Sequence, residues 1–589
     1  MRTFSAIVLI FSVMFTGFAQ QAKVTSAKAD PAAELIGLWR AKHRFGPDVR
    51  GTLILEKGGG KWKAQISGRT VSASVSEKGI SFELPGEKGS FEGSFENGKT
   101  RVKGFWIQPA TVSNGTPYAS PVELLKTGEN VWRGEVIPLE DELTLYLSVA
   151  RRSDGVVGAF LRNPERNLGR FIRIDRLERE GDAVKLVGAD SGGQKGRVWA
   201  EGIVYGDVLT VFLRGTTFDF RRVEPERTSD FYPRPVPEKY VYAKPPALDD
   251  GWETATLEEV GIDRGKIEKF IQMMIDTPIE SVSSSEIHGI LIARRGRLVL
   301  EEYFHGEHRE KPHDTRSASK SVTATLVGAA IQKGLPVKAA DSVYSVVNGG
   351  SFPEDLPADK RRLTLENLLT MSSGLDCDDG DSDSPGNEDV MQEQTEQPDW
   401  YKYTLDLKMI RRPGEKAVYC SGGANLIGDV VARGTGRSLP ELFGNLLAEP
   451  LQIKRFYMNL TPTGDAYMGG GIRFLPRDFM KFGQLHLDGG KWKGRQIISK
   501  DWAEKATSPL YELRDYKYGY LWWVTDYPYK NRTVRAFFAG GNGGQVVIGI
   551  PELDLVIAFW GGNYSDPALF IPQRVFVPEQ ILPAVGENK

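Results

Sequence analysis

Apolar and polar residues alternate over much of the chain between about residues 35 and 223. Leu143, Leu145, Leu147 and Val149 occupy every second position, which is the period of a strand with one buried face. The turn dipeptide Asn97-Gly98 separates two further strand-like stretches and predicts a hairpin. Stretches with helical periodicity are scarce here. The pattern therefore predicts an all-β domain over residues 30–230, either a barrel, for example a lipocalin-like one, or a sandwich.

A weak internal repeat qualifies this prediction. Gly37-Leu38-Trp39-Arg40 and Val131-Trp132-Arg133-Gly134 are similar, and each opens a series of predicted strands. Two similar β units are thus an alternative to a single barrel or sandwich. We expect the aromatic residues of this region to be core residues, although an exposed set could bind a glycan or a protein partner.

The pattern changes beyond a proline-rich segment at residues 231–250. Five prolines in this segment disfavour regular structure and predict a stiff linker, so we place the domain boundary there. In residues 251–589, predicted strands near both ends enclose a mostly helical stretch from Thr364 to about His486. Helices are also predicted at Leu257–Met274 and near Pro578–Val585, and a strand at Tyr518–Val524. This order predicts an α+β domain with an antiparallel sheet flanked by helices and a helical insertion.

The first residues resemble a targeting signal. Arg2 precedes an apolar run from Ala6 to Phe15, and Gly17 and Ala19 are small residues at a spacing suited to cleavage. The run is shorter than the ~20 residues that a membrane-spanning helix needs. We therefore expect residues 1–19 to be a signal peptide and the protein to be exported, to the periplasm or outside the cell. An uncleaved anchor is the alternative, and no later apolar stretch is long enough to span a membrane.

Composition and charge exclude several other functions. The 589 residues include 75 basic and 77 acidic ones, so no basic surplus indicates nucleic-acid binding. The six histidines form no metal-binding pattern, and we expect neither a metal site nor a cofactor. The glycines of the acidic run Asp376 to Asp383 miss the position that a calcium loop requires, so we expect a solvated loop at the rim of a cleft.

Ser317 and Lys320 lie three residues apart at the start of an apolar segment that ends at Gly334. The spacing predicts a mostly buried helix, and glycine suits its left-handed C-terminal stop. The Lys320 amine and the Ser317 hydroxyl should then project from one face, near the helix N-terminus. Because burial disfavours an ammonium ion, we expect Lys320 to lose its charge readily and to act as a base toward Ser317. A serine N-cap followed by a solvated lysine is the alternative.

Two later segments carry further candidates. Tyr419 precedes a predicted helix, where its phenol could point into a cleft and exchange a proton with Ser317; a packing role is the alternative. The run Ala539-Gly540-Gly541-Asn542-Gly543-Gly544-Gln545 lies between predicted strands, and its glycines would let the backbone approach a ligand closely. An N–H from this edge, together with the Ser317 N–H, would form an oxyanion hole; an ordinary hairpin loop is the alternative.

In this order, the three segments resemble the motifs of the serine β-lactamase and penicillin-binding protein superfamily. The likeness is strongest to its class C-like branch, which includes esterases and 6-aminohexanoate-dimer hydrolases, and covers about residues 252–589. It implies that Ser317 is acylated and that Lys320 and Tyr419 carry its proton. It further implies an oxyanion hole made by the N–H groups of Ser317 and Asn542, and substrate-pocket candidates at Ser421, Gly540, Gly541 and Gln545.

Two positions depart from the family pattern. Ser421 stands where Tyr-x-Asn is usual, and Ala539-Gly540-Gly541 replaces Lys-Thr-Gly or His-x-Gly. The second change removes a cation that helps to hold the substrate carboxylate in β-lactam-processing members. We therefore expect a serine hydrolase that cleaves an ester, amide or small peptide. A D-Ala-D-Ala carboxypeptidase or class C-like β-lactamase is one alternative, and a binding protein with a vestigial hydrolase site is another.

Cys377 and Cys420 are the two cysteines of the chain. Both flank segments that we expect to border the site, and an exported protein permits a disulfide between them. Spacing alone does not establish that bond.

Overall fold

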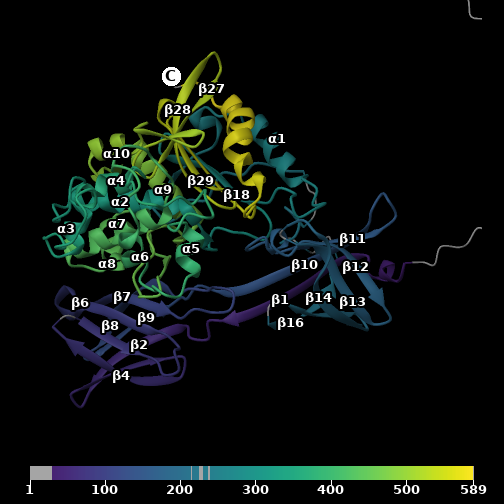
Figure 1. The fold of residues 1–589 in the computed structure, drawn as a ribbon, viewed down its shortest axis with the longest axis horizontal. Coiled ribbons are helices and arrows are strands. Elements are labelled where there is room, and N and C mark those ends of the chain that lie inside the picture. The colour runs from purple at the N-terminus through teal and green to yellow at the C-terminus, as the bar shows by residue number, and fades with distance from the viewer. Residues whose placement is uncertain are drawn as a thin grey trace, which may run out of the picture.

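The structure, a computed structural model, describes residues 30–587 except 78, 191, 214, 225–227, 229 and 236–238. The predicted signal peptide, residues 1–19, lies outside the described residues. None of the helices in the described ranges is both long enough and apolar enough to cross a membrane. Figure 1 shows two β bodies next to a larger body of helices and strands.

The first β body is a closed ring of eight strands. Its last strand, β9, pairs with β8 on one side and with β2 on the other. The ring of strands is therefore closed and has no free edge. The strands are β2 (Gly51–Gly58), β3 (Lys61–Ile66), β4 (Arg69–Ser76), β5 (Gly79–Glu83), β6 (Ser90–Glu96), β7 (Arg101–Gln108), β8 (Tyr118–Gly128) and β9 (Val131–Val136). We call this body the first barrel. The predicted hairpin at Asn97-Gly98 is present, since it joins β6 to β7.

The second β body, which we call the second barrel, is also closed. Its first strand, β1, pairs with β10 and with β16. The strands are β1 (Gly37–Gly46), β10 (Asp141–Arg151), β11 (Val157–Arg162), β12 (Ile174–Glu180), β13 (Ala183–Ala189), β14 (Lys195–Tyr205), β15 (Val208–Leu213) and β16 (Thr216–Arg222). The first barrel is thus inserted between the first two strands of the second, and β1 and β10 run between the two bodies (Figure 1).

This topology decides between the alternatives for the β region. The predicted β-rich region with a closed, barrel-like sheet is confirmed. Two such barrels are present, in line with the alternative of two β units, so a single barrel and a sandwich were wrong. The sequence repeat did not mark their starts: Trp39 lies on the strand that opens the second barrel, but Trp132 lies on the strand that closes the first. Both side chains are buried in the core of their own barrel, which explains why similar residues occur at different places in the two rings.

The C-terminal body is built on a nine-stranded sheet. The strand order is β17-β19-β18-β30-β29-β28-β27-β26-β25, and only the β17–β19 pairing is parallel. The strands are β17 (Glu253–Thr254), β18 (Ile287–Arg294), β19 (Arg297–Tyr303), β25 (Tyr511–Leu513), β26 (Tyr516–Tyr518), β27 (Trp523–Tyr529), β28 (Arg532–Gly541), β29 (Gln545–Ile550) and β30 (Leu555–Gly561). Every residue of β18, β29 and β30 is buried, as expected for strands covered on both faces.

Helices cover the two faces of this sheet. One core contains α2 (Lys320–Gln332), α7 (Ser421–Thr435) and α9 (Pro476–Leu487); the other contains α1 (Arg264–Ile275) and η11 (Pro572–Ile581), a π-helix. The remaining α-helices are α3 (Val343–Val347), α4 (Leu365–Leu369), α5 (Glu388–Glu393), α6 (Trp400–Asp406), α8 (Leu439–Phe443) and α10 (Lys500–Ala506). Short strands complete the domain: β20 (His313–Asp314), β21 (Phe456–Asn459), β22 (Arg473–Phe474), β23 (Lys491–Trp492) and β24 (Arg495–Gln496).

Several predicted element boundaries were wrong. The helix expected from Leu257 begins only at Arg264, because Gly261 has a left-handed φ of 74° and the Asp263 carboxylate accepts the Lys266 N–H as an N-cap. The strand expected at 518–524 is interrupted, since the Gly519 N–H donates to the Trp522 carbonyl (2.8 Å) in a tight turn. The last helical stretch begins earlier than the predicted Pro578, since the π-helix at 572–581 is followed by the 3-10 helix η12 (Leu582–Ala584).

The first barrel is joined to the C-terminal domain by backbone pairing. Met458 and Asn459 of β21 pair with Ala119 and Tyr118 of β8. Because β21 also pairs with β22, and β22 with β20, a continuous ribbon of strands runs from the barrel to the segment that precedes Ser317. The barrel therefore has a fixed position relative to that serine.

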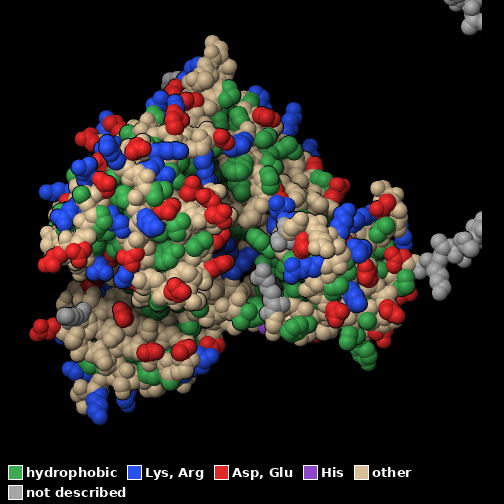
Figure 2. Space-filling model, viewed as in Figure 1, with side chains coloured by type: hydrophobic (Ala, Val, Ile, Leu, Met, Phe, Trp, Pro, Cys, Tyr) green, Lys and Arg blue, Asp and Glu red, His purple; other side chains and the backbone are tan. Residues whose placement is uncertain are grey.

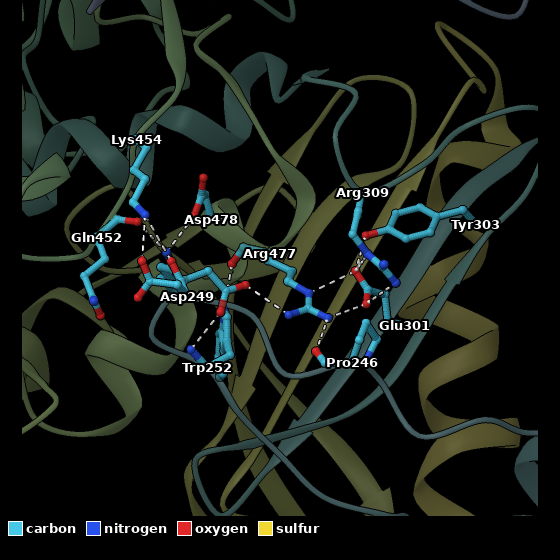
Figure 3. Close-up of polar contacts among 12 residues, drawn as sticks. Pro246, Asp249, Trp252, Glu301, Tyr303, Arg309, Gln452, Lys454, Arg477 and Asp478 are labelled. Carbon is cyan, nitrogen blue, oxygen red and sulfur yellow. Dashed lines mark hydrogen bonds and ion pairs between the residues drawn. The ribbon is translucent and has the colours of Figure 1, made fainter. Parts of the chain in front are cut away.

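Arg477, at the start of α9, holds in place the segment around Asp250 and Trp252, through which the chain enters the C-terminal domain (Figure 3). Its guanidinium donates to both carboxylate oxygens of Glu301 on β19 (3.0 and 2.6 Å) and to Asp250 (3.0 Å). The Trp252 indole donates to the Arg477 carbonyl (3.0 Å). Such a bidentate, buried guanidinium–carboxylate pair orients the entering segment, sheet and helix together.

Because three histidines are buried, we predict that the protein becomes less stable to unfolding in mild acid. Burial lowers the pKa of His305 and His313 to about 3 and that of His486 to about 4, so all three are neutral in the folded protein. In the unfolded chain they take up protons below about pH 6.5. Since only the unfolded state gains these protons, we expect the free energy of unfolding to decrease as the pH falls from about 6.5 to 4, by up to ~1.4 kcal/mol per pH unit per histidine.

Urea unfolding at pH 7.5, 6 and 5 measures this dependence. His486→Phe, which can keep the ring contact with Trp522, should reduce the pH slope by about one histidine's share. His308→Gln, at an exposed position, serves as the control and should leave the slope unchanged. An identical slope in His486→Phe and the unchanged protein would contradict the prediction.

Candidate active site

Ser317 lies in a short turn that is held from both sides. It belongs to the 3-10 helix η6 (Arg316–Ser319) and not to α2. η6 leads directly into α2. Arg316 has a left-handed φ of 49°, uncommon for a residue with a side chain. Its N–H donates to Asp314 Oδ1 (2.9 Å), and its carbonyl accepts from the Gly471 N–H (3.0 Å). These contacts fix the backbone of Arg316, the residue that precedes Ser317, and so help to position the Ser317 hydroxyl.

Lys320 is the first residue of α2 and is fully buried. Its Nζ donates to Ser317 Oγ at 3.0 Å, so the structure brings the two residues together. Burial lowers the pKa of Lys320, but Tyr419, Glu388 and Asp379 raise it more, and the pKa lies above its ordinary value. This direction contradicts the expectation that Lys320 readily loses its charge, because the combined effect of these three neighbours outweighs desolvation.

Tyr419 lies beside the same ammonium group. Lys320 Nζ is 5.1 Å from the centroid of the Tyr419 ring, which is stacked on Trp523 at 5.5 Å. The Arg514 guanidinium lies 4.8 Å from the ring centroid. The Tyr419 carbonyl accepts the Asp379 N–H (2.9 Å), so both its backbone and its ring are held in place. Lys320 thus has Ser317 and Tyr419 as neighbours.

The acidic run Asp376 to Asp383 contacts the start of α7, next to Tyr419. Asp379 Oδ2 accepts from the Ser421 N–H (2.8 Å) and hydroxyl (2.6 Å) at the start of α7. Burial and then Glu388 raise the pKa of Asp379. Cys377 and Cys420 form a disulfide with their Cα atoms 5.5 Å apart, which closes the loop around Tyr419. The prediction of a solvated acidic loop was therefore wrong for Asp379, which positions the helix and the Tyr419 backbone.

Two predicted substrate-pocket residues, Ser421 and Gln545, use their side chains in hydrogen bonds inside the protein. Ser421 is fully buried, and its hydroxyl is directed to Asp379. Gln545 is also buried, and its amide donates to the Gly561 carbonyl (2.7 Å). Neither side chain is available to a substrate, and we correct both assignments. Sequence reasoning missed the buried acceptors because Asp379 and Gly561 lie 42 and 16 residues away.

The glycine-bearing edge of β28 lies against the nucleophile turn. A Cβ on Gly541 would lie 2.3 Å from the Thr315 carbonyl oxygen and 3.0 Å from the Ala318 nitrogen, so only glycine fits. Gly540, by contrast, faces Phe538 and Trp523. Asn542 follows, and its side-chain oxygen accepts the Ser565 N–H (2.7 Å). The strand therefore delivers the Asn542 backbone next to Ser317.

Comparison with known proteins bears on this geometry. Residues 276–561 match the family model described as Beta-lactamase. These residues form a β-lactamase-like domain. The predicted resemblance is thereby confirmed. Over 225 residues the chain is also 27% identical to a 6-aminohexanoate-dimer hydrolase of Paenarthrobacter ureafaciens, a match that covers 36% of this chain and 55% of the relative. The chain thus spans about half the length of the curated relative it matches.

Solved structures with a similar arrangement include two related to penicillin-binding proteins. One is the penicillin-binding protein of Bacillus halodurans (TM-score 0.37, 15% identity, 49% of this chain and 94% of that one). Another is an octameric penicillin-binding protein homologue of Pyrococcus abyssi (TM-score 0.40, 21% identity, 55% of this chain and 80% of that one).

A cavity of about 300 Å³ opens on Ser317 and Asn542 of the β-lactamase-like domain. Its walls come from all three bodies: Asn114 belongs to the loop between β7 and β8 of the first barrel, and Arg166 to the loop after β11 of the second. Gly470 and Gly471 complete the wall beside Ser317. A run of three glycines at 469–471 was visible in the sequence and could have pointed to this segment. No sequence signal marked Asn114 or Arg166.

Proposed function

We propose that the protein is a serine hydrolase that cleaves an ester or amide through an acyl-enzyme at Ser317. The single observation that carries this proposal is the 3.0 Å contact between Ser317 Oγ and the buried Lys320 Nζ, at the edge of a cavity. A hydroxyl in contact with a buried, oriented ammonium group is a nucleophile whose oxyanion is electrostatically stabilised. The match to the β-lactamase family model supports this assignment.

We assign the proton transfers to Tyr419, because the surrounding groups raise the pKa of Lys320 and so favour its protonated form. As Ser317 Oγ attacks the substrate carbonyl, its proton passes to the Tyr419 oxygen and the hydroxyl proton of Tyr419 passes to the leaving alcohol or amine, while Lys320 stabilises the developing charge. In the second half, a water molecule attacks the acyl group and gives a proton to the Tyr419 oxygen, while the Tyr419 hydroxyl proton returns to Ser317 Oγ. This step releases the acid and restores Ser317.

Two backbone N–H groups, of Ser317 and Asn542, are our proposal for the oxyanion hole. Both residues face the same cavity, and the close packing of Gly541 on the nucleophile turn supports their proximity. Backbone donors aimed at the carbonyl oxygen would stabilise the tetrahedral intermediate. Ser317 would also benefit from its place in the first helical turn, where backbone N–H groups favour negative charge.

Export and the domain limits remain part of this proposal. We retain residues 1–19 as a signal peptide, 30–230 as the β region, 231–250 as linker and 251–589 as the hydrolase domain. The disulfide between Cys377 and Cys420 supports an oxidising compartment.

A covalent label tests the proposed nucleophile. Treatment with a neutral fluorophosphonate should add one adduct, detected by intact-mass spectrometry and located on Ser317 by peptide mapping. Ser317→Ala should remain unlabelled. Ser319→Ala removes a neighbouring hydroxyl that donates to the Arg316 carbonyl, and this control should still be labelled. An unlabelled native protein, or an adduct that persists in Ser317→Ala, would overturn the assignment.

A further inference from the structure

Arg514 lies at the tip of the hairpin that joins β25 to β26. Leu513 pairs with Tyr516, so Arg514 and Asp515 form a two-residue turn. Arg514 has a left-handed φ of 54°, a conformation that favours glycine or asparagine in such a turn. An arginine at this position is unfavourable for the backbone. The stability of the turn therefore does not explain why an arginine is present, and its side chain is a candidate for a functional role.

The hairpin packs against the segment that carries Tyr419. The Tyr511 hydroxyl on β25 donates to the carbonyl of Gly414, in the loop that leads to Tyr419 (2.9 Å). The Arg514 guanidinium lies over the face of the Tyr419 ring, 4.8 Å from the ring centroid. Arg514 is exposed, whereas Tyr419 is buried. The cation thus covers the ring from the solvent side of the site.

Arg514 has no acidic partner among the described residues. On the face of the molecule shown in Figure 2, basic and acidic side chains are intermixed over the helical part of the C-terminal domain. Arg514 departs from this pattern, because it forms no ion pair with a carboxylate of the described chain. The adjacent Asp515 pairs with Arg574 instead (3.5 Å). The positive charge of Arg514 is therefore not committed to another group and acts on the Tyr419 ring.

A cation over the face of a tyrosine ring favours the phenolate over the neutral phenol. The attraction depends on the electron density of the ring face, which increases when the phenol loses its proton. In the proposed mechanism, the Tyr419 proton passes to the leaving group as the Ser317 proton arrives, so negative charge develops on Tyr419 whenever the first transfer runs ahead. A contact that strengthens only at that moment lowers the barrier without tightening substrate binding.

We propose that Arg514 is a positioning residue that acts through Tyr419 and promotes the transfer of the phenol proton to the leaving group. The inference rests on the proposed hydrolase function and specifies the substrates that depend on Arg514. These are alkyl esters and amides, whose leaving groups are too basic to depart without a proton. Esters of acidic phenols do not need this proton and should be cleaved nearly as well without Arg514.

Three acetate esters with different leaving groups test this role. p-Nitrophenol leaves as its anion, whereas phenol and, still more, ethanol need a proton as they leave. We expect Arg514→Met to lower kcat/KM by about 5- to 20-fold for ethyl acetate, by less for phenyl acetate, and by less than about twofold for p-nitrophenyl acetate. Hydrolysis of the full-length protein's substrates is followed in a pH-stat, and kcat/KM reports the half-reaction in which the leaving group departs.

Three further variants separate this role from a structural one. Arg514→Lys keeps a cation that can lie over the ring and should retain most of the ethyl acetate activity. Arg514→Gly suits the left-handed backbone, so it should repeat the kinetic effect of Arg514→Met without lowering the urea midpoint of unfolding. Arg264→Met removes an arginine that lies 5.4 Å from the centroid of Tyr242, in the core on the other face of the sheet. This control should not change the dependence on the leaving group.

The role of Arg514 is overturned if Arg514→Met loses the same activity toward all three esters, loses none, or if the native protein hydrolyses none of them. Labelling by the neutral fluorophosphonate separates this failure from failure of the hydrolase itself, because fluoride leaves without a proton from Tyr419. If Ser317 is labelled while the dependence on the leaving group is absent, only the role of Arg514 is wrong. If Ser317 is not labelled, the proposed function is wrong as well.

Discussion

Lys320→Met is expected to lower kcat/KM for an ester substrate by about 10³-fold or more. The variant removes the ammonium group 3.0 Å from Ser317 Oγ, and with it both the stabilisation of the serine oxygen and the cation beside Tyr419. Methionine has a similar length and tolerates burial, so the fold should be retained. Steady-state kinetics and the rate of fluorophosphonate labelling should fall together, because both depend on activation of Ser317.

A second lysine near the other end of α2 provides a matched control. Lys333 is exposed, and Lys333→Met removes one cation from the end of the same helix without reaching the cavity. Its activity should stay within about twofold of the unchanged protein. Lys320→Met with more than about a tenth of the original activity would contradict the role we assign to this lysine.

Arg162→Met should destabilise the protein by about 3–5 kcal/mol. Arg162 on β11 of the second barrel pairs with Glu286, which immediately precedes β18 of the central sheet (2.9 Å), and both side chains are almost completely buried. Burial raises the pKa of Glu286, but Arg162 and then the neighbouring histidines lower it more, to about 2. Without the guanidinium, a buried carboxylate is left without its main counter-charge. Chemical unfolding at pH 7 measures the loss.

The double variant Arg162→Met/Glu286→Gln isolates the pair. It removes the unpaired charge and should recover part of the stability lost in Arg162→Met. Lys103→Met breaks an exposed pair between the first barrel and Glu449 (2.5 Å) and should cost less than about 1 kcal/mol. Equal losses in Arg162→Met and Lys103→Met would show that burial of the pair has no special effect.

Local patterns predicted the elements whose causes are local. The hairpin at Asn97-Gly98 depends on a turn whose conformation these two residues favour, and the helix after Ser317 ends near Gly334, which has a φ of 70°. Strand periodicity predicted the β region but not its division into two rings. That division depends on which strands pair, and β1 meets β10 across nearly a hundred residues of inserted barrel.

For the candidate site, the sequence by itself determined the contact between Ser317 and Lys320. The two residues are three positions apart, and this spacing places their side chains on the same face of a helical turn. Only the tertiary structure decided that the neighbours of Lys320 raise its pKa, that Asp379 accepts hydrogen bonds from Ser421, and that Arg166 of a distant barrel reaches the cavity. The physical reason is that a pKa, a buried hydrogen bond and a cavity wall each sum contributions from residues that are near in space but far apart in the chain.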